Sequence, residues 1–418
     1  MHRVIAALLA VASPMTIAQA QSPGPTQGPP LTLERALDLA GATAPSVEAA
    51  SAGVRAAEAG RTVAGLRPNP TINAETENVV GTGQYEGLRS AETTVGVALP
   101  IELGGKRSAR IAVADAIGIR AQVDQAVAAA DVRLAVTQAY VEAAAAERRV
   151  VTAREQAAIA SEALRAANVR VRAGRASPIE EQRADVLRLN AAAALERAER
   201  LAETARGNLA RRIGQPVAGP LDLAWFERVE GVADPRPTAP ALTLAAARAD
   251  AATAAAQVRL ARSQRIPDLT VSASARRLEQ TDDVAAVFGV SIPIPLFNRG
   301  TAAVAQARAE RDRADALVRA AELDADQAVA NARAEVANAA VTARTAAGPT
   351  LAAALESARI ARIGYREGKF GQLDLLDAER TLSETRTAAI DALATYHDAK
   401  ARLERLVAAA PSPEENNQ

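Results

Sequence analysis

Two hydrophobic periods alternate along this 418-residue chain. Four short segments carry apolar side chains at every second position, near residues 71–80, 91–101, 268–277 and 284–294. In the second of them, Val95, Val97 and Leu99 share one face. Side chains of a strand point alternately to its two faces, and about ten residues of a tilted strand cross a bilayer. The pattern therefore predicts four membrane strands, each with a lipid face and a water face.

Long Ala-rich stretches of helical period follow each pair of strands. Between Gly105 and Gly174 the sequence contains no Pro and one further Gly, so a helix there would extend roughly 100 Å at 1.5 Å per residue. A turn and a return helix to about Ile213 would complete a hairpin. The second half predicts a matching hairpin, kinked at Gly348-Pro349 because Pro interrupts the helical hydrogen bonds.

The two halves of the chain have matching landmarks. Leu99-Pro100-Ile101-Glu102-Leu103 is matched 193 residues later by Ile292-Pro293-Ile294-Pro295-Leu296. Arg172-Ala173-Gly174-Arg175 is matched 194 residues later by Arg366-Glu367-Gly368-Lys369. A unit of this size is too large for a solenoid repeat. We therefore expect an internal two-fold repeat, with a first unit at 31–213 (hairpin 104–213) and a second at 241–407 (hairpin 300–407).

The remaining segments are short. Residues 1–20 are typical of a secretory signal, with a basic start at Arg3, an apolar run and the small-x-small sequence Ala18-Gln19-Ala20. The others are a Pro/Gly-rich linker at 21–30, an irregular equatorial segment at 214–240 and a tail at 408–418. Because the chain has no Cys, we expect the signal to be cleaved without attachment of an N-terminal lipid.

Four strands are too few to close a barrel. An open sheet edge is not tolerated in lipid, because its backbone amides and carbonyls would lack partners. Three copies of the chain would supply twelve strands, an even number within the range of outer-membrane barrels. The expected fold is therefore mainly α with a membrane β-barrel: long antiparallel helical hairpins, and four strands per chain contributing to a trimeric 12-stranded barrel.

Composition and charge exclude several classes of function. The formal net charge is +0, so no basic field would attract nucleic acid. After removal of the signal, His397 is the one His and Cys is absent, so we expect no metal site, no cofactor and no catalytic residues. Gly104-Gly105-Lys106-Arg107-Ser108 is not a phosphate-binding loop, because Pro100 stands where that motif requires Gly.

Two groups of motifs resemble a known family. Tyr365-Arg366-Glu367-Gly368, followed by Leu373-Asp374-Leu375-Leu376-Asp377-Ala378-Glu379-Arg380, is similar to the TolC-type outer-membrane efflux channels over the whole mature chain. Arg67-Pro68-Asn69-Pro70 and the run from Leu99 to Arg107 resemble the branch that serves cobalt-zinc-cadmium type heavy-metal exporters. The resemblance implies a homotrimer in outer-membrane lipid, continued across the periplasm by an α-barrel.

The same resemblance implies a function and partners. The trimer would be a passive exit duct for heavy-metal cations, docked on a periplasmic adaptor (membrane fusion) protein and an inner-membrane pump of the resistance-nodulation-division class. Alternatives within the fold are a duct for drugs or for a protein secreted by a type I system. A rival of another class is a soluble periplasmic coiled-coil scaffold, whose alternating segments would form a small sheet.

The resemblance also implies where the duct closes. The family's periplasmic constriction corresponds to Tyr365, Asp374 and Asp377. Independently of the family, the two carboxylates are three residues apart on one helix face, so a trimer would place six of them around the pore. An ordinary solvated helix face is the alternative interpretation of the two carboxylates, and packing at a helix end is the alternative for Tyr365. The first-half equivalents are Glu180 and Arg183, so we expect the second hairpin to line the gate.

The hairpin turns are expected to be the periplasmic tips. Resemblance assigns adaptor contact to seven residues there: Arg172, Gly174, Arg175, Ser177, Arg366, Gly368 and Lys369. Both Gly turns are also ordinary helix C-caps, whichever role they serve. The family's gate carries an Arg five residues after the Tyr, whereas this chain has Phe370 there. The bonds that close the gate are therefore expected to be weaker or rearranged.

Overall fold

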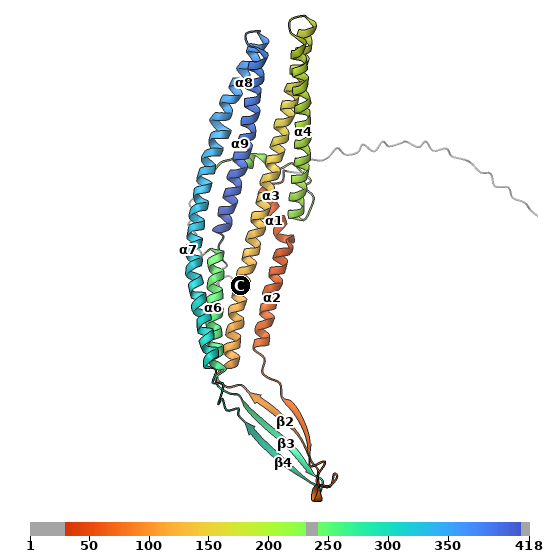
Figure 1. Cartoon of the computed structure of the whole chain (residues 1–418), viewed down its shortest axis with the longest axis vertical. Coiled ribbons are helices and arrows are strands. Elements are labelled where there is room, and N and C mark those ends of the chain that lie inside the picture. Colours follow the sequence, from red (N-terminus) through yellow and green to blue (C-terminus); the bar gives the residue numbers. More distant parts are fainter. Residues whose placement is uncertain (1–29, 231–240, 411–418) are drawn as a thin grey trace, which may run out of the picture.

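The computed structural model describes residues 30–230 and 241–410. The expected signal peptide lies outside these residues, as do parts of the linker, equatorial segment and tail. Figure 1 shows an elongated molecule with a sheet at one end and two hairpin tips at the other. The helices in the described ranges are α1 (Leu33–Thr43), α2 (Pro45–Ala64), α3 (Lys106–Arg172), α4 (Pro178–Ile213), α5 (Leu223–Phe226), α6 (Leu242–Ser263), α7 (Thr301–Thr345), α8 (Leu351–Arg366) and α9 (Gln372–Leu406). None of them combines the length and apolarity that a membrane-spanning helix needs.

Local sequence determines where the long helices begin and end. The helix α3 runs for 67 residues and ends where Gly174 adopts a φ of 67°. The hydroxyl of Ser177 caps α4, and Pro178 occupies the first helical position, where its missing N–H costs nothing. The predicted kink of the second hairpin is confirmed, because a π-turn at Ala346–Thr350 joins α7 to α8 around Gly348.

The four strands form one antiparallel sheet in chain order. They are β1 (Thr71–Glu77), β2 (Glu92–Ile101), β3 (Leu269–Leu278) and β4 (Asp283–Ser291). The central β2–β3 pair joins the two halves of the chain along ten residues. In the described residues β1 and β4 each have one unpaired edge. Two strands are shorter than predicted: β1 stops where Asn78 takes a positive φ of 59°, and β4 stops before Pro293 and Pro295, which lack amide hydrogens.

The sheet register separates a polar face from an apolar face. Glu75, Thr94 and Arg276 are successive partners across β1, β2 and β3, and therefore share the polar face. The guanidinium of Arg276 binds Glu92 at 2.8 Å and Thr94 at 3.0 Å. Val95 and Phe288 belong to the other face, where Phe288 is 81% exposed. An exposed apolar face of this kind is suited to lipid.

The main core lies at the middle of the molecule, around aromatic residues. Tyr140 is fully buried, its hydroxyl donating to the carbonyl of Leu31 at 2.7 Å, and Tyr396 donates to the carbonyl of Glu230 at 2.9 Å. Trp225 packs between the rings of Tyr140 and His397, 5.4 and 4.2 Å away. The equatorial segment, which includes the short α5, is therefore attached to both α3 and α9.

Acidification is expected to weaken this core through His397. Its ring is 4% exposed, Nε2–H donates to the carbonyl of Phe226 at 2.8 Å, and Nδ1 has no partner in the described residues. Burial is the main reason that the pKa of the imidazole falls to about 4; Lys400 also lowers the pKa, whereas the hydrogen bond to Phe226 and the charge of Glu230 raise it. The unfolded chain therefore binds the proton more readily. The contribution of the neutral imidazole to the free energy of unfolding is fully present above pH about 6.5. It falls by on the order of 3 kcal/mol on acidification to pH about 4.

The measurement is the melting temperature of the detergent-solubilised full chain at several pH values. His397→Gln retains an N–H donor for the carbonyl of Phe226 and has no titrating group. Its melting temperature should therefore fall less than that of the wild-type chain between pH 7 and pH 4.5. Equal losses in the two proteins would show that His397 does not cause the acid sensitivity.

Candidate gate at the helical tips

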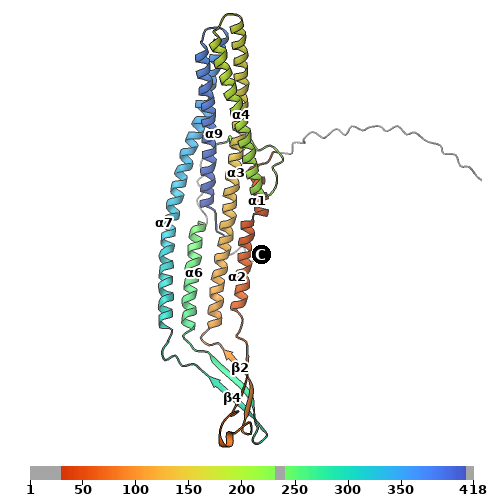
Figure 2. The ribbon, with the colours of Figure 1, turned by 45° about the vertical axis from the view of Figure 1, so that its right-hand side comes forward.

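The two hairpin tips lie at the same end of the molecule, opposite the sheet (Figures 1 and 2). The first tip joins α3 to α4, and the second joins α8 to α9. All seven residues predicted to contact an adaptor are exposed there. Of these, Gly174 and Gly368 have φ values of 67° and 73°, which only Gly adopts without strain. The tips therefore have rigid turns and exposed basic side chains.

Tyr365 links the second tip to the first. The guanidinium of Arg170, from α3, lies over its ring, 5.0 Å from the centroid. The same guanidinium lies 3.8 Å from a carboxylate oxygen of Glu180, at the start of α4. The amide of Gln372 also donates to the carbonyl of Glu180 at 3.4 Å. Tyr365 is thus held against the first hairpin by a cation–π contact and an adjacent ion pair.

Sequence reasoning missed Arg170 as the partner of Tyr365. It located the departure from the family at Phe370 and did not identify a replacement. In the structure the Phe370 ring packs on Gly364, where an added Cβ would lie 2.2 Å from the ring. Phe370 therefore stabilises its own turn, and the positive charge beside Tyr365 comes from the other hairpin. A clue was present in the sequence, since Arg170 lies about one helical turn before the Gly174 tip.

Asp374 and Asp377 both lie on the exposed face of the first turns of α9. One carboxylate oxygen of Asp374 accepts the amide N–H of Gly371 at 2.9 Å, which caps the helix. Asp377 is 73% exposed and pairs with Arg380 at 3.3 Å. Asp374 therefore also has a structural role as a helix cap, which the sequence analysis did not assign to it. Neither contact covers the carboxylates, so both remain accessible to cations.

An ion pair with a buried carboxylate lies farther along the second hairpin, where α8 meets α9. The guanidinium of Arg362 forms two hydrogen bonds with the carboxylate of Glu379, which is 7% exposed. The bonded carboxylate raises the pKa of Arg362. Sequence reasoning missed this pair, because its members lie on opposite sides of a turn and no local spacing connects them. The pair fixes the register of α8 against α9.

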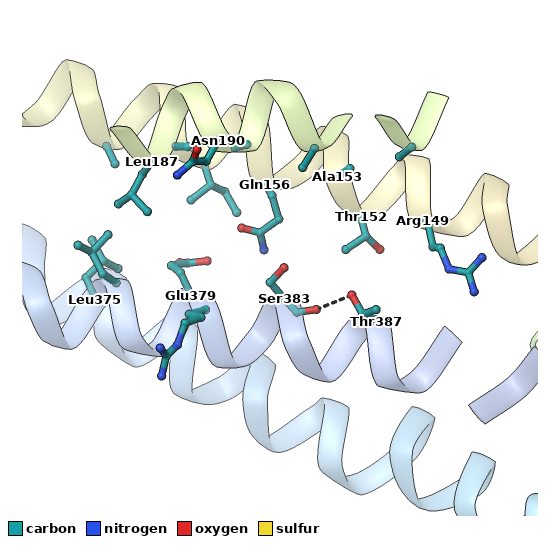
Figure 3. Close-up of a pocket in the computed structure, with 18 residues that line it drawn as sticks. Arg149, Thr152, Ala153, Gln156, Leu187, Asn190, Leu375, Glu379, Ser383 and Thr387 are labelled. Atoms are coloured by element: carbon teal, nitrogen blue, oxygen red, sulfur yellow. Dashed lines mark hydrogen bonds between the residues drawn. The ribbon is translucent and has the colours of Figure 1, made fainter. Parts of the chain in front are cut away.

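An open cavity of about 470 Å³ separates α9 from α4 beside this pair. Figure 3 shows side chains of α3, α4 and α9 around it, among them Gln156, Asn190 and Glu379. Below the tips, α9 packs on α3 rather than on α4. In the described ranges, no group of three or more His, Asp and Glu side chains is arranged to hold a metal ion.

The chain combines long helical hairpins, which turn at one end of the molecule, with a two-faced antiparallel sheet at the other end. This combination is typical of the class of outer-membrane efflux channels. Residues 36–215 and 239–409 match the family "Outer membrane efflux protein", and the chain belongs to that family. It is 33% identical to the cobalt-zinc-cadmium resistance protein CzcC of Cupriavidus metallidurans over 390 residues, 90% of each chain.

Two solved structures have the same fold. A membrane protein from Pseudomonas aeruginosa superposes with a TM-score of 0.76 at 20% identity, covering 90% of both chains. The outer membrane protein VceC of Vibrio cholerae superposes with a TM-score of 0.72 at 20% identity, covering 90% of this chain and 96% of VceC. The expected family and the combination of long helices with four antiparallel strands are therefore confirmed.

Proposed function

We propose that this chain is the passive exit duct of a tripartite system that exports heavy-metal cations. The assignment of heavy-metal cations as the substrate rests on the 33% identity to a cobalt-zinc-cadmium resistance protein along 90% of both chains. The proposal contains no catalytic step, since the energy would come from an inner-membrane pump of the resistance-nodulation-division class. A periplasmic adaptor would connect that pump to the seven exposed tip residues.

The proposed assembly is a homotrimer in the outer membrane. The unpaired edges of β1 and β4 support it, because joining three sheets edge to edge gives a closed 12-stranded barrel without open hydrogen-bonding groups. The apolar face would contact lipid and the face of Glu75, Thr94 and Arg276 would line the lumen. The helices would form a periplasmic α-barrel. The two family-matched stretches support an internal two-fold repeat.

The proposed gate is at the tips. Arg170 over Tyr365 would hold the second hairpin inward, and Asp374 with Asp377 would form a ring of six carboxylates in the trimer. The cavity between α4 and α9 supports a moving second hairpin, because below the tips α9 packs on α3 rather than on α4. Its movement would break the hydrogen bond from the side chain of Gln372 to the carbonyl of Glu180. The ring would concentrate divalent cations and repel anions at the entrance.

Deleting the gene for this chain should lower the host's resistance to cobalt, zinc and cadmium several-fold, because export would lose its outlet. Growth inhibition by these ions is the measurement, with a plasmid copy of the gene as the control. Unchanged metal resistance with new drug sensitivity would overturn the metal assignment in favour of the multidrug alternative. Recovery of the chain from the soluble periplasm would instead favour the scaffold alternative.

A further inference from the structure

An open pocket with two arginines lies where the sheet joins the helices. Arg259 and Arg262 project from the last turns of α6 towards Gly105 and Ser108 at the start of α3, around a volume of about 380 Å³. Both arginines are exposed, and neither forms an ion pair in the described part of the chain. Ile266 lines the same pocket and is 47% exposed. The pocket therefore combines unneutralised positive charge with an apolar wall.

The nearby acidic residues do not neutralise this charge. Asp268 binds Lys106 at 2.6 Å, and Glu102 binds Arg110 through two hydrogen bonds. These pairs lower the pKa of both carboxyl groups. Within the described residues, the next carboxylate back along α6 is that of Asp250, which already pairs with Arg120. The two arginines thus have no acidic partner at this level of the molecule.

The pocket and the acidic pairs lie on opposite sides of the chain. Glu102 continues the alternation of the polar face of β2, which also carries Glu92 and Thr94. Lys106 and Arg110 are four residues apart on one face of α3, beside Glu102 and Asp268. Ser108 is two residues from each and therefore projects from the opposite face. The pocket consequently opens on the same side as the apolar face of the sheet.

The position of the pocket relative to the helices keeps it accessible. The helices pack side by side in the order α2, α3, α6, α7, so α3 and α6 are the two inner members. The pocket lies between these two, away from the outer members, α2 and α7, where another copy of the chain would pack. Ile101 and Leu103, 39% and 38% exposed, continue the apolar surface towards the sheet.

We propose that this pocket binds the phosphate of an anionic phospholipid in the inner leaflet of the outer membrane. The inference rests on the proposed membrane position of the sheet. Lipid headgroups lie where membrane strands end and water-exposed helices begin, which is the level of this pocket. A guanidinium matches phosphate geometry, and Arg259 and Arg262 present two from one helix face. The acyl chains follow Ile266, Leu103 and Ile101.

The test is native mass spectrometry of the full-length protein in detergent with added phosphatidylglycerol or phosphatidylcholine. The wild-type protein should retain phosphatidylglycerol preferentially. Arg259→Gln with Arg262→Gln should weaken that retention by about tenfold or more. The control is Arg313→Gln with Arg319→Gln, which removes two exposed arginines from the first half of α7, and it should bind like the wild-type protein.

Three results would overturn the proposal: equal retention of the two lipids by the wild-type protein, undiminished retention by the Arg259 and Arg262 variant, or full displacement of lipid by equimolar inorganic phosphate. The last would indicate a free-anion site. Channel conductance in planar bilayers separates this inference from the proposed function. A protein that conducts but does not select phosphatidylglycerol refutes the lipid site alone, whereas a protein without conductance refutes the duct.

Discussion

Replacing Asp374 and Asp377 together by Asn should reduce the cation selectivity of the channel in planar bilayers and weaken its block by trivalent cations about tenfold or more. A trimer would lose six carboxylates at its narrowest point. The fold should be preserved, because an Asn side chain in place of Asp374 keeps an oxygen that can accept the N–H of Gly371, now 2.9 Å from the Asp374 carboxylate. Asp377 contributes one exposed ion pair with Arg380, whose loss costs little.

The chain offers a matched control for the two substitutions. Asp312 and Asp315 are also three residues apart, on α7, and both interact with Arg311. Their replacement by Asn removes the same charge at the same spacing from a helix face far from the tips. Conductance and block should then remain those of the wild-type channel. Equal effects from the two pairs would mean that overall charge sets the selectivity, not a ring at the gate.

Gly96→Ala should prevent most molecules of the protein from assembling as trimers in the outer membrane. Gly96 pairs with Ser274 at the centre of β2–β3, where an added Cβ would lie 2.3 Å from the Cβ of Ser274 and 2.8 Å from the carbonyl oxygen of Ala273. The two central strands would have to separate, at a cost on the order of 3 kcal/mol. The measurement is the amount of SDS-resistant, heat-dissociable trimer recovered from outer membranes.

Gly118→Ala is the control for this substitution. An added Cβ at Gly118 meets no atom within 4 Å, and Ala favours a helix over Gly by roughly 0.5–1 kcal/mol. Trimer recovery should therefore equal or exceed that of the wild-type protein. Normal assembly of the Gly96→Ala protein would show that β2 and β3 tolerate a wider separation than the structure indicates.

The elements of this fold follow closely from local sequence. Alternation predicted four strands, and long Pro-free stretches predicted the hairpins, because both signals act within a few residues of chain. The errors occur at strand ends, where β4 stops before Pro293 although the apolar alternation continues to Ile294. Hydrophobic alternation indicates which face of a strand is apolar. It does not indicate the residue at which the strand's backbone hydrogen bonds to its neighbour end.

The candidate gate was predicted less completely, because part of it depends on side chains from distant segments. Asp374 and Asp377 could be selected from one helix, since their spacing alone places them on one face. The partners of Tyr365 and Glu379 are Arg170 and Arg362, and no local period connects the members of either pair. Each contact exists because packing of separate helices brings the two groups together.

The sequence by itself therefore determined the hairpins, the two-faced strands, the rigid Gly turns and the family. Each of these depends on backbone preference or on the period of one segment. Only the tertiary structure decided that Arg170 covers Tyr365, that the pocket of Arg259 and Arg262 opens on the apolar side, and that β2 pairs with β3 along its whole length. Those features depend on the relative placement of elements, which packing and register set and a one-dimensional pattern does not contain.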